Sequence, residues 1–545
     1  MASTSWLLRR RVARSSVPPS TEFFGSQIGG KTVINYSYTD FPWKLLAWDI
    51  YYFFHFAWAL PYIVMPSKPT DSGDLDELAL TRGNLFCVLV HTVLCILQLA
   101  FILCLPLSLF FPLWIVIPAI ALFFGINHAL CRLLNGKDIV FHSDARYARA
   151  RKEHEHEQWI FLNGVAVGEH WMKNNLNRLA LTFKRPVLGI HNRTSGIIFD
   201  VVECLIQRNF CYATSDVRVC YSKIKEKLYD PKFSKVIFIL HSQGGIEGGL
   251  VLDWLLQELP QDLLAKLEVY TFGNAANHFN NPHRHVDSQV TALRHPLLAS
   301  VDATRAPDFS SDGRPRRHRG ENTHADRPWF SRANNQRPPT PTSPPPLSTA
   351  ISRPLAAETM SPNPAEVSDR AIGHIEHYAH TTDFVALWGV LHFARSATAT
   401  HTLPRFIGRL FARTSDRGGH QFCQHYLDGM FPLEKDSITG EFLGCAETNN
   451  EFMESEVALG KDGDEATDAR EAFESSWLGD MTAEERRGEE DVEVHLGESP
   501  VATAGSGFTP VMRRRRRKVK ELSRLWQYRN GKSPPTNGIL RTATL

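Results

Sequence analysis

Three residues of this chain, Ser242, Asp383 and His420, have the types and the order that nucleophilic catalysis by serine requires. A serine hydroxyl is a weak nucleophile at neutral pH, so it needs a base within hydrogen-bond distance and an acid that orients that base. Ser242 follows a short apolar run, Asp383 follows a strand-like segment, and His420 follows two glycines. We therefore interpret the three as catalytic nucleophile, acid and base.

Two other residues compete for these roles. His425 is the alternative base, but the helix expected around it makes it less able to reach over a sheet edge. Asp416 is the alternative acid, although it lies close to His420 in sequence and has no strand before it. The chain contains 23 histidines, so the order and the strand-end positions carry the assignment rather than the residue types alone.

The stretch from Lys235 to Gly245 predicts how the serine is presented. A β-branched apolar run ends in His241-Ser-Gln-Gly244, and a helical pattern follows. A serine at the apex of a strand–turn–helix is a nucleophile elbow, in which small neighbours let the strand and helix approach closely. Leu240 stands where Gly-x-Ser-x-Gly has its first glycine, and its bulk could displace the turn that exposes Ser242. The small residues expected on the helix side are Gly244, Gly245, Gly248 and Gly249.

An oxyanion hole requires two backbone N–H groups aimed at the developing negative charge. We expect one from Gln243, directly after the serine. The other is expected from the early loop Asn163-Gly164-Val165, because glycine lets the backbone turn its N–H inward. The alternative for this loop is a plain β-turn, which Asn-Gly also favours. His191 and Asn192, after the next strand, are expected to line the substrate pocket.

Strands alternate with helices from Trp159 onward, and this pattern predicts an α/β fold with a mostly parallel sheet that has helices on both faces. The expected strands are 160–162, 185–190, 235–240, 267–272 and 374–380. The expected helices are 169–182, 197–208, 217–228, 246–259, 384–393, 405–411 and 421–430. The sheet domain is thus divided into residues 145–285 and 371–445.

A long uncharged segment precedes this domain. Residues 84–131 contain no Asp, Glu, Lys or Arg, which exceeds one membrane-spanning helix and suits two. We expect a transmembrane helical hairpin within 84–132, divided by Pro106 and Pro112; a hairpin that dips into one leaflet is the alternative. Positive flanks place loops on the cytosolic side, so the domain is expected to be cytosolic. These flanks are Arg82, Arg132 and Lys137.

Residues 42–65 are rich in Trp, Tyr and Phe, interrupted by Lys44, Asp49 and His55. Aromatic rings with a polar edge favour the boundary between lipid and water. We expect this segment to lie at the membrane interface or to form a third spanning helix.

Three segments have the composition of disordered chain, because they contain too few apolar residues to bury: 1–41, 286–370 and 446–545. The last is first acidic and then basic, and Arg513 to Lys518 is a run of six cations. We expect this run to contact anionic lipid; a nuclear-localisation-like patch or a solvated tail without a role are the alternatives.

No cofactor or metal ion is expected. The nine cysteines follow no metal or disulfide spacing and are interpreted as buried thiols, which suits a reducing compartment. Glu153-His-Glu-His-Glu157 contains two histidines without further ligands, and a solvated helix is the better interpretation. The net charge of +2 gives no reason to expect a nucleic-acid partner.

Five motifs of the sheet domain are distinctive: Phe161-Leu-Asn-Gly164, Gly189-Ile-His-Asn192, Leu240-His-Ser-Gln-Gly-Gly245, Tyr270-Thr-Phe-Gly-Asn274 and Gly419-His-Gln-Phe422. Through them, residues 159–285 and 371–433 resemble the serine-esterase and lipase-like α/β-hydrolases of the DUF676 type, and are most similar to uncharacterised fungal membrane proteins of that group. Two departures concern Asn163, where the family usually has histidine before the glycine, and Leu240. The resemblance implies an α/β-hydrolase fold and hydrolysis of carboxylic esters, including those of lipids.

Two functions follow from these patterns. The first is a membrane-anchored serine hydrolase that cleaves acyl esters of lipids through an acyl-enzyme intermediate, with a lipid or other acyl ester as substrate and the membrane as partner. The second is a catalytically inactive relative that acts as a membrane scaffold or binding module, favoured by Leu240 and by the absence of His-Gly in the first loop. A weaker third possibility is a multipass membrane protein with a regulatory soluble part. Short distances from Ser242 to a histidine would favour the first.

Overall fold

The computed structural model describes residues 20–24, 27–30, 41–67, 72–285, 370–395, 402–447, 450–459 and 518–534. The insertion expected to be disordered, 286–370, lies outside the described residues except for Arg370. Arg513 to Arg517 of the basic run also lie outside them, so the expected lipid contact of that run stays a prediction.

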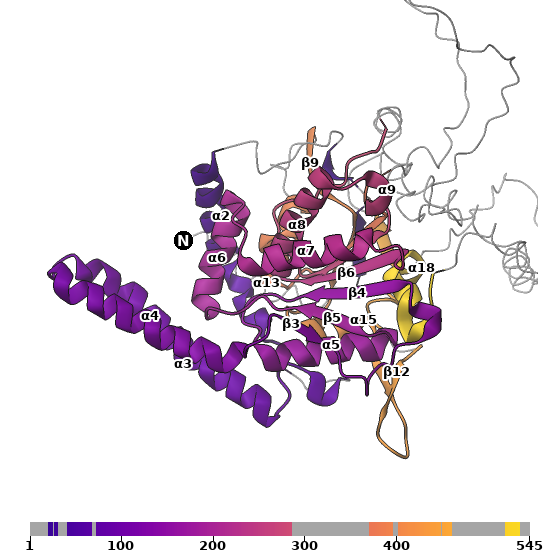
Figure 1. Cartoon of the computed structure of the whole chain (residues 1–545), viewed down its shortest axis with the longest axis horizontal. Coiled ribbons are helices and arrows are strands. Elements are labelled where there is room, and N and C mark those ends of the chain that lie inside the picture. Colours follow the sequence, from indigo (N-terminus) through magenta and orange to yellow (C-terminus); the bar gives the residue numbers. More distant parts are fainter. Residues whose placement is uncertain are drawn as a thin grey trace, which may run out of the picture.

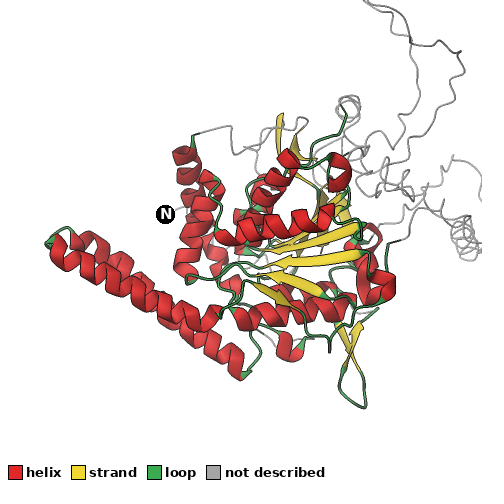
Figure 2. Cartoon of the chain, viewed as in Figure 1, coloured by secondary structure: helices red, strands yellow, loops and turns green. Residues whose placement is uncertain are grey.

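A nine-stranded sheet forms the centre of the molecule (Figure 1; Figure 2). Six neighbouring strands, from β10 to β5, run parallel, and β1 and β3 pair antiparallel at either side of them. The mostly parallel α/β sheet is thus as predicted. The strand order is β13 (Val457–Leu459), β1 (Ser20–Phe24), β10 (Arg409–Thr414), β8 (His374–His380), β7 (Leu267–Phe272), β6 (Lys235–His241), β4 (Glu157–Leu162), β5 (Val187–Ile190) and β3 (Val140–His142).

The central strands are apolar because both faces of the sheet are covered. Phe238 and Leu240 of β6 belong to one apolar core, whereas Ile237 and Ile239 belong to the other. The first core lies under α6 (Ile197–Phe210), α7 (Ser215–Tyr229), α8 (Gly244–Glu258), α9 (Gln261–Leu264), α13 (Phe384–Trp388) and α14 (Val390–Arg395). The second lies under α5 (Glu169–Phe183), η6 (Phe422–Leu427, a π-helix), α15 (Asp428–Met430), α18 (Val519–Leu522) and η7 (Leu525–Gly531).

Two helices, α3 (Arg82–Ser108) and α4 (Leu113–Asn135), are long and apolar enough to cross a membrane. They form an antiparallel hairpin that projects from the domain (Figure 1). Pro106 lies inside α3 rather than dividing the pair, while Pro112 is the N-cap of α4. Polar side chains fix the base of the hairpin to the domain: Gln98 Nε2 donates to Ser195 O at 2.7 Å, and Asn135 Nδ2 donates to Thr194 O at 2.8 Å.

The aromatic segment forms α2 (Pro42–Phe56) and the 3₁₀ helix η3 (Ala57–Ile63), which pack on the domain. Asp49 of α2 is buried and accepts hydrogen bonds from Arg208 at 3.0 Å and Asn209 at 2.7 Å. The Trp388 indole donates to Asp49 O at 3.1 Å. A helix of 15 residues that buries a carboxylate against α6 packs on the domain, and among the described helices it is not one of the two that are long and apolar enough to cross a membrane.

Residues 405–411, expected to be helical, instead form parts of β9 (Thr402–Ile407), which pairs with β2 (Gln27–Gly30), and of β10. Leu410 and Phe411 are buried in opposite cores, so this short apolar run has a period of two. Periodicity alone does not separate such a run from a helix, and that is why the expectation was wrong.

Parts of both terminal segments expected to be disordered are folded. Residues 20–24 form β1 within the sheet, and 457–459 form β13 beside it. At the C-terminal end, Leu522, Leu525 and Tyr528 are buried in the second core. The acidic-then-basic composition of the segment concealed this short apolar cluster. The remaining elements are η4 (Gly73–Leu75), η5 (Lys152–His154) and the hairpin of β11 (Leu433–Lys435) and β12 (Phe442–Cys445).

Candidate active site

Ser242 occupies the tight turn between β6 and α8. Its φ is +58°, a left-handed conformation that costs an L-residue roughly 1–2 kcal/mol. The surrounding backbone holds it there: Ser242 N–H donates to Phe272 O at 3.0 Å, and Ser242 O accepts from Gly245 N–H at 2.9 Å and Ala275 N–H at 3.2 Å. The sequence expectation of a strained serine between a strand and a helix matches this geometry.

Leu240 does not displace the turn. Its side chain is fully buried and lies against Gly248 of α8, where a Cβ would be 2.4 Å from Leu240 Cδ1. On the other side of the turn, a Cβ on Gly244 would be 2.6 Å from Leu162 O. The large side chain of Leu240 on β6 thus occupies the space that is left because Gly248 on α8 has no side chain. The close approach of β6 and α8 is therefore preserved.

His420 connects the serine to the acid. Its Nε2 lies 2.9 Å from Ser242 Oγ, and its Nδ1 lies 3.0 Å from Asp383 Oδ2. With Nδ1 protonated, the ring donates to the carboxylate and accepts the serine hydroxyl hydrogen. The imidazole also stacks on His241, and His241 Nε2–H donates to His420 O at 2.9 Å. The structure thus brings the three residues selected from the sequence into one hydrogen-bonded row.

Asp383 is fully buried at the end of β8 and caps α13. Its Oδ1 accepts from Val385 N–H at 2.8 Å, and its Oδ2 accepts from the Tyr426 hydroxyl at 2.7 Å as well as from His420. Burial alone would raise the pKa of this carboxyl, but His420 and these donors outweigh burial and hold the pKa below its ordinary value. The acid is therefore ionised at neutral pH. Gly273, with φ +54°, gives it room, because a Cβ there would be 2.6 Å from Asp383 Oδ2.

His425, the alternative base, has both ring nitrogens engaged elsewhere. Its Nδ1 accepts from Gln421 N–H at 2.9 Å, and its Nε2 donates to Pro66 O at 3.0 Å. Burial lowers its pKa to about 4, so the ring is neutral. His425 holds the loop after η3 in place, and it does not contact Ser242. Asp416 does follow a strand, β10, contrary to expectation, but it is not the acid partner because Asp383 occupies that position.

The expected oxyanion donors surround Ser242. Gly164 touches the serine: a Cβ on Gly164 would lie 2.3 Å from Ser242 Cβ, so only glycine fits. Among the described residues, no acceptor is paired with the backbone N–H of Gln243, Gly164 or Val165. Free N–H groups on both sides of a serine are what an oxyanion requires. The loop is also more than a plain turn, because its Asn163 side chain is bonded to the neighbouring β5 loop.

A row of amide side chains links the two sides of this candidate oxyanion hole. Asn163 Oδ1 accepts from Asn192 N–H at 2.9 Å, and Asn192 Nδ2 donates to Gln243 Oε1 at 2.9 Å. Gln243 Nε2 donates to Gln207 Oε1 at 3.0 Å. Gln207 in turn bonds Glu247, whose pKa is raised well above its ordinary value by burial and by the neighbouring acid Asp216. Asn192 thus fixes the side chain of the residue that follows the nucleophile.

His191, the other expected pocket residue, faces away from this row. Its Nε2 bonds Val167 O at 2.8 Å, and its ring meets Phe141 edge to face. Both residues directly follow β5, so their position in sequence did not show that Asn192 reaches the site and His191 does not.

The helix η3 covers the site. Ser242 is 2% exposed and His420 is 8% exposed. His420 N–H donates to Tyr62 O at 3.2 Å, and Gln421 Nε2 donates to Ile63 O at 2.9 Å. The aromatic segment therefore closes directly over the base.

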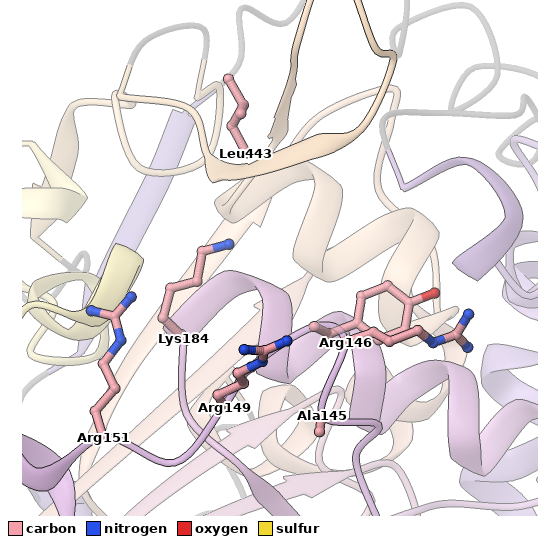
Figure 3. Close-up of a pocket in the computed structure, with 8 residues that line it drawn as sticks. Ala145, Arg146, Arg149, Arg151, Lys184 and Leu443 are labelled. Carbon is pink, nitrogen blue, oxygen red and sulfur yellow. The ribbon is translucent and has the colours of Figure 1, made fainter.

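A separate basic hollow of about 440 Å³ lies elsewhere. It is lined by Arg146, Arg149, Arg151 and Lys184, with Leu443 opposite (Figure 3). The four cations precede the starts of β4 and β5, whereas Ser242 follows the end of the parallel strand β6. The hollow is thus at the opposite edge of the sheet and has no part in the site. In the described part of the chain, no three His, Cys, Asp or Glu side chains are placed to hold a metal ion.

Sequence reasoning missed Tyr426, Gln207 and η3. Tyr426 lies in the same π-helix as His425, and no spacing rule pointed to its hydroxyl. Gln207 is one of several polar residues on α6, and only its neighbours in space identify it. The aromatic composition of 42–65 was recognised, but its position over His420 was not.

Comparison with known proteins adds no relative: no family model, no curated protein and no solved structure matches the chain.

Proposed function

We propose that this protein is a serine hydrolase of the α/β-hydrolase fold that cleaves carboxylic esters, with lipids as the substrate class. The observation that carries the proposal is the row from Ser242 Oγ through His420 to Asp383, with distances of 2.9 and 3.0 Å. A serine with positive φ, an imidazole and a buried carboxylate occur in the order and positions that acyl transfer needs. The resemblance to serine esterases of the DUF676 type supports the same assignment.

In the proposed reaction, Ser242 Oγ attacks the ester carbonyl carbon while His420 Nε2 takes the hydroxyl proton. The N–H groups of Gln243 and of the Gly164 loop stabilise the negative oxygen that forms. His420 then gives its proton to the departing alcohol, which leaves an acyl group on Ser242. A water molecule, activated by His420 in the same way, releases the carboxylic acid and restores the serine. Asp383 stabilises the imidazolium in both halves.

The scaffold alternative receives less support from this geometry. An inactive relative has no need for a histidine at hydrogen-bond distance from a serine with φ +58°. Leu240 and Asn163 were the two departures from the motifs that favoured the scaffold alternative. Gly248 opposite Leu240 and the hydrogen bonds of Asn163 compensate for them.

The test is labelling of the full chain, solubilised in detergent, with a fluorescent fluorophosphonate. We expect wild type and Ser222→Ala, a variant at an exposed serine of α7, to be labelled, and Ser242→Ala to be unlabelled. Hydrolysis of a soluble short-chain nitrophenyl ester should fall by about a thousandfold or more in Ser242→Ala. Unlabelled but folded wild type, or equal labelling of Ser242→Ala, would overturn the proposal.

A further inference from the structure

The far half of the hairpin touches nothing else in the described chain. Phe101, Phe123 and Phe124 form the last layer that contacts the domain, where their rings meet Phe199 of α6. From 102 to 122 no residue is buried, and Leu109 and Phe110 in the turn are 86% and 84% exposed. A contiguous apolar surface of this kind requires a partner.

The turn of the hairpin is apolar and internally hydrogen-bonded. Between Leu105 and Ile117 the side-chain polar groups are the Ser108 hydroxyl, which donates to Leu105 O at 2.6 Å, and the indole N–H of the exposed Trp114. Backbone N–H groups of the turn are also satisfied locally, as Phe110 N–H donates to Leu107 O and Phe111 N–H to Ser108 O, both at 3.1 Å. A turn that emerged into water would not need these features, whereas a turn inside hydrocarbon does.

The free length of the hairpin fits half a bilayer. Beyond the Phe101 layer, α3 continues to Ser108 and α4 begins at Leu113, which gives about 10–15 Å of helix at 1.5 Å per residue. The hydrocarbon core of a bilayer is about 30 Å thick, so one leaflet is about 15 Å. Gln98 and Asn127 mark the base of this free length, because both are buried and bonded to Ser195 of the domain.

Exposed apolar side chains continue from the hairpin over α6 to α2. Val202, Ile206 and Phe210 lie on one face of α6 and are 40–51% exposed. The side of α2 away from the domain is also apolar: Trp48 and Phe54 are 59% and 70% exposed. Both helices lie on the side of the domain from which the hairpin projects (Figure 1). Trp and Tyr on α2 are the residues that favour the lipid–water boundary.

We propose that the protein is monotopic: the α3–α4 hairpin enters one leaflet of a lipid bilayer, its turn ends within the hydrocarbon, and α2 and α6 lie on the surface of that same leaflet. This arrangement places η3 and the underlying Ser242 at the membrane surface. The membrane-binding geometry does not depend on catalysis. Its consequence for the substrate, an ester lipid of the contacted leaflet, rests on the proposed function.

The test uses the full chain in phosphatidylcholine vesicles and a water-soluble maleimide that does not cross the bilayer. Phe110→Cys reports the turn, and Ile438→Cys, 93% exposed on the β11–β12 hairpin, is the matched control. The native cysteines are accounted for by wild type treated in parallel. We expect Ile438→Cys to react in intact vesicles with the domain outside. Phe110→Cys should stay unreactive when the reagent is present on both sides, and should react after denaturation in detergent.

Reaction of Phe110→Cys only when the reagent reaches the vesicle lumen would mean that the hairpin spans, and would overturn the proposal. Reaction of Phe110→Cys in intact vesicles would mean that the hairpin is not inserted, and would also overturn the proposal. Tryptophan fluorescence identifies what covers the turn, since lipids brominated in mid-chain should quench wild type more than Trp114→Phe. Equal quenching of the two would show that another protein copy, not lipid, protects the turn.

The interfacial helices are tested in the same vesicles. Lipids brominated near the headgroup should quench wild type more than Trp48→Phe, while mid-chain bromine should not distinguish the two; the reverse result would overturn the placement of α2. Fluorophosphonate labelling of the same samples separates the two proposals. A labelled Ser242 with a lumenal turn defeats only the monotopic arrangement, and a protected turn with an unlabelled, folded protein defeats only the hydrolase.

Discussion

Single residues decide whether the site of this protein can work, and each does so through a neighbour far away in sequence. Leu240 replaces the usual glycine of a nucleophile elbow, and its side chain fits because Gly248 opposite it has no side chain. Asn163 stands where the sequence comparison by motif led us to expect histidine, and its amide bonds the Gly164 loop to the backbone of Asn192. Departures from a motif are therefore best judged together with the residues that pack against them.

Asn192→Ala is expected to lower kcat by about tenfold to a hundredfold and to leave KM nearly unchanged. The substitution removes the hydrogen bond that fixes the Gln243 side chain, so an oxyanion donor is mispositioned without being removed, and the loss stays at or below that of a deleted donor. Steady-state kinetics with a soluble ester would measure it. Asn174→Ala on α5 is the control, and an equal fall in kcat for both variants would contradict the positioning role.

At the scale of elements, the C-terminal segment is part of the core. Arg524 bonds Glu268 of β7 through two nitrogens at 3.1 and 2.9 Å, and the Tyr528 hydroxyl donates to the same carboxylate at 2.9 Å. Burial favours the protonated form of Glu268, but Arg524 and Lys235 outweigh burial and hold its pKa well below the ordinary value. A segment that looks like a tail thus neutralises a buried charge at the centre of the sheet.

Arg524→Gln should lower the free energy of unfolding by about 3–5 kcal/mol near neutral pH, because Glu268 is left buried without its main cation. The depressed pKa means that the pair contributes fully above the unfolded value of about 4.5 and loses its contribution as pH falls toward the folded value. The difference in unfolding temperature between wild type and variant should therefore shrink from pH 6 to pH 3.

Lys532→Gln is the control for this prediction. Lys532 pairs with Glu447 at 2.7 Å, but both side chains are about half exposed, so its loss should cost less than about 1 kcal/mol. Thermal unfolding in detergent would compare the variants. An Arg524→Gln variant as stable as Lys532→Gln would show that the C-terminal segment is dispensable.

On the scale of the whole molecule, the insertion interrupts the domain without separating its halves. His283 and Arg370 are paired as a β-bridge, and Ala371 N–H donates to Pro282 O at 3.0 Å. The chain therefore leaves and re-enters the fold at one place, between β7 and β8.

Replacing residues 286–369 by a Gly-Ser linker of about eight residues should preserve the fold. The shorter loop costs less closure entropy, so the free energy of unfolding should stay equal or rise by up to about 2 kcal/mol. Fluorophosphonate labelling and the unfolding temperature would both be measured. A variant that fails to fold would show that the insertion contributes contacts to the domain.

Strand–helix alternation was sufficient to predict the mostly parallel sheet and the turn at Ser242, because those features are local in sequence. The order of Ser242, Asp383 and His420 was sufficient to select residues that lie together, because strand ends meet at one edge of such a sheet. Tyr426, Gln207 and the buried role of Arg524 were not predicted, since their partners lie tens to hundreds of positions away. The helix predicted for residues 405–411 was wrong, because a run of only seven residues fits the period of a helix and that of a strand equally well.

Under the two proposals, the apolar side chains of α2 and α6 have a kinetic consequence. An enzyme held on a bilayer by Trp48 and Phe210 meets its substrate in two dimensions, where the effective concentration is the mole fraction of ester in the leaflet. Diluting the vesicles in buffer would then leave the rate per bound enzyme unchanged, while diluting the ester with inert lipid would lower it. The ester concentration at which the enzyme is half-saturated would then be a mole fraction in the leaflet instead of a molar concentration in solution.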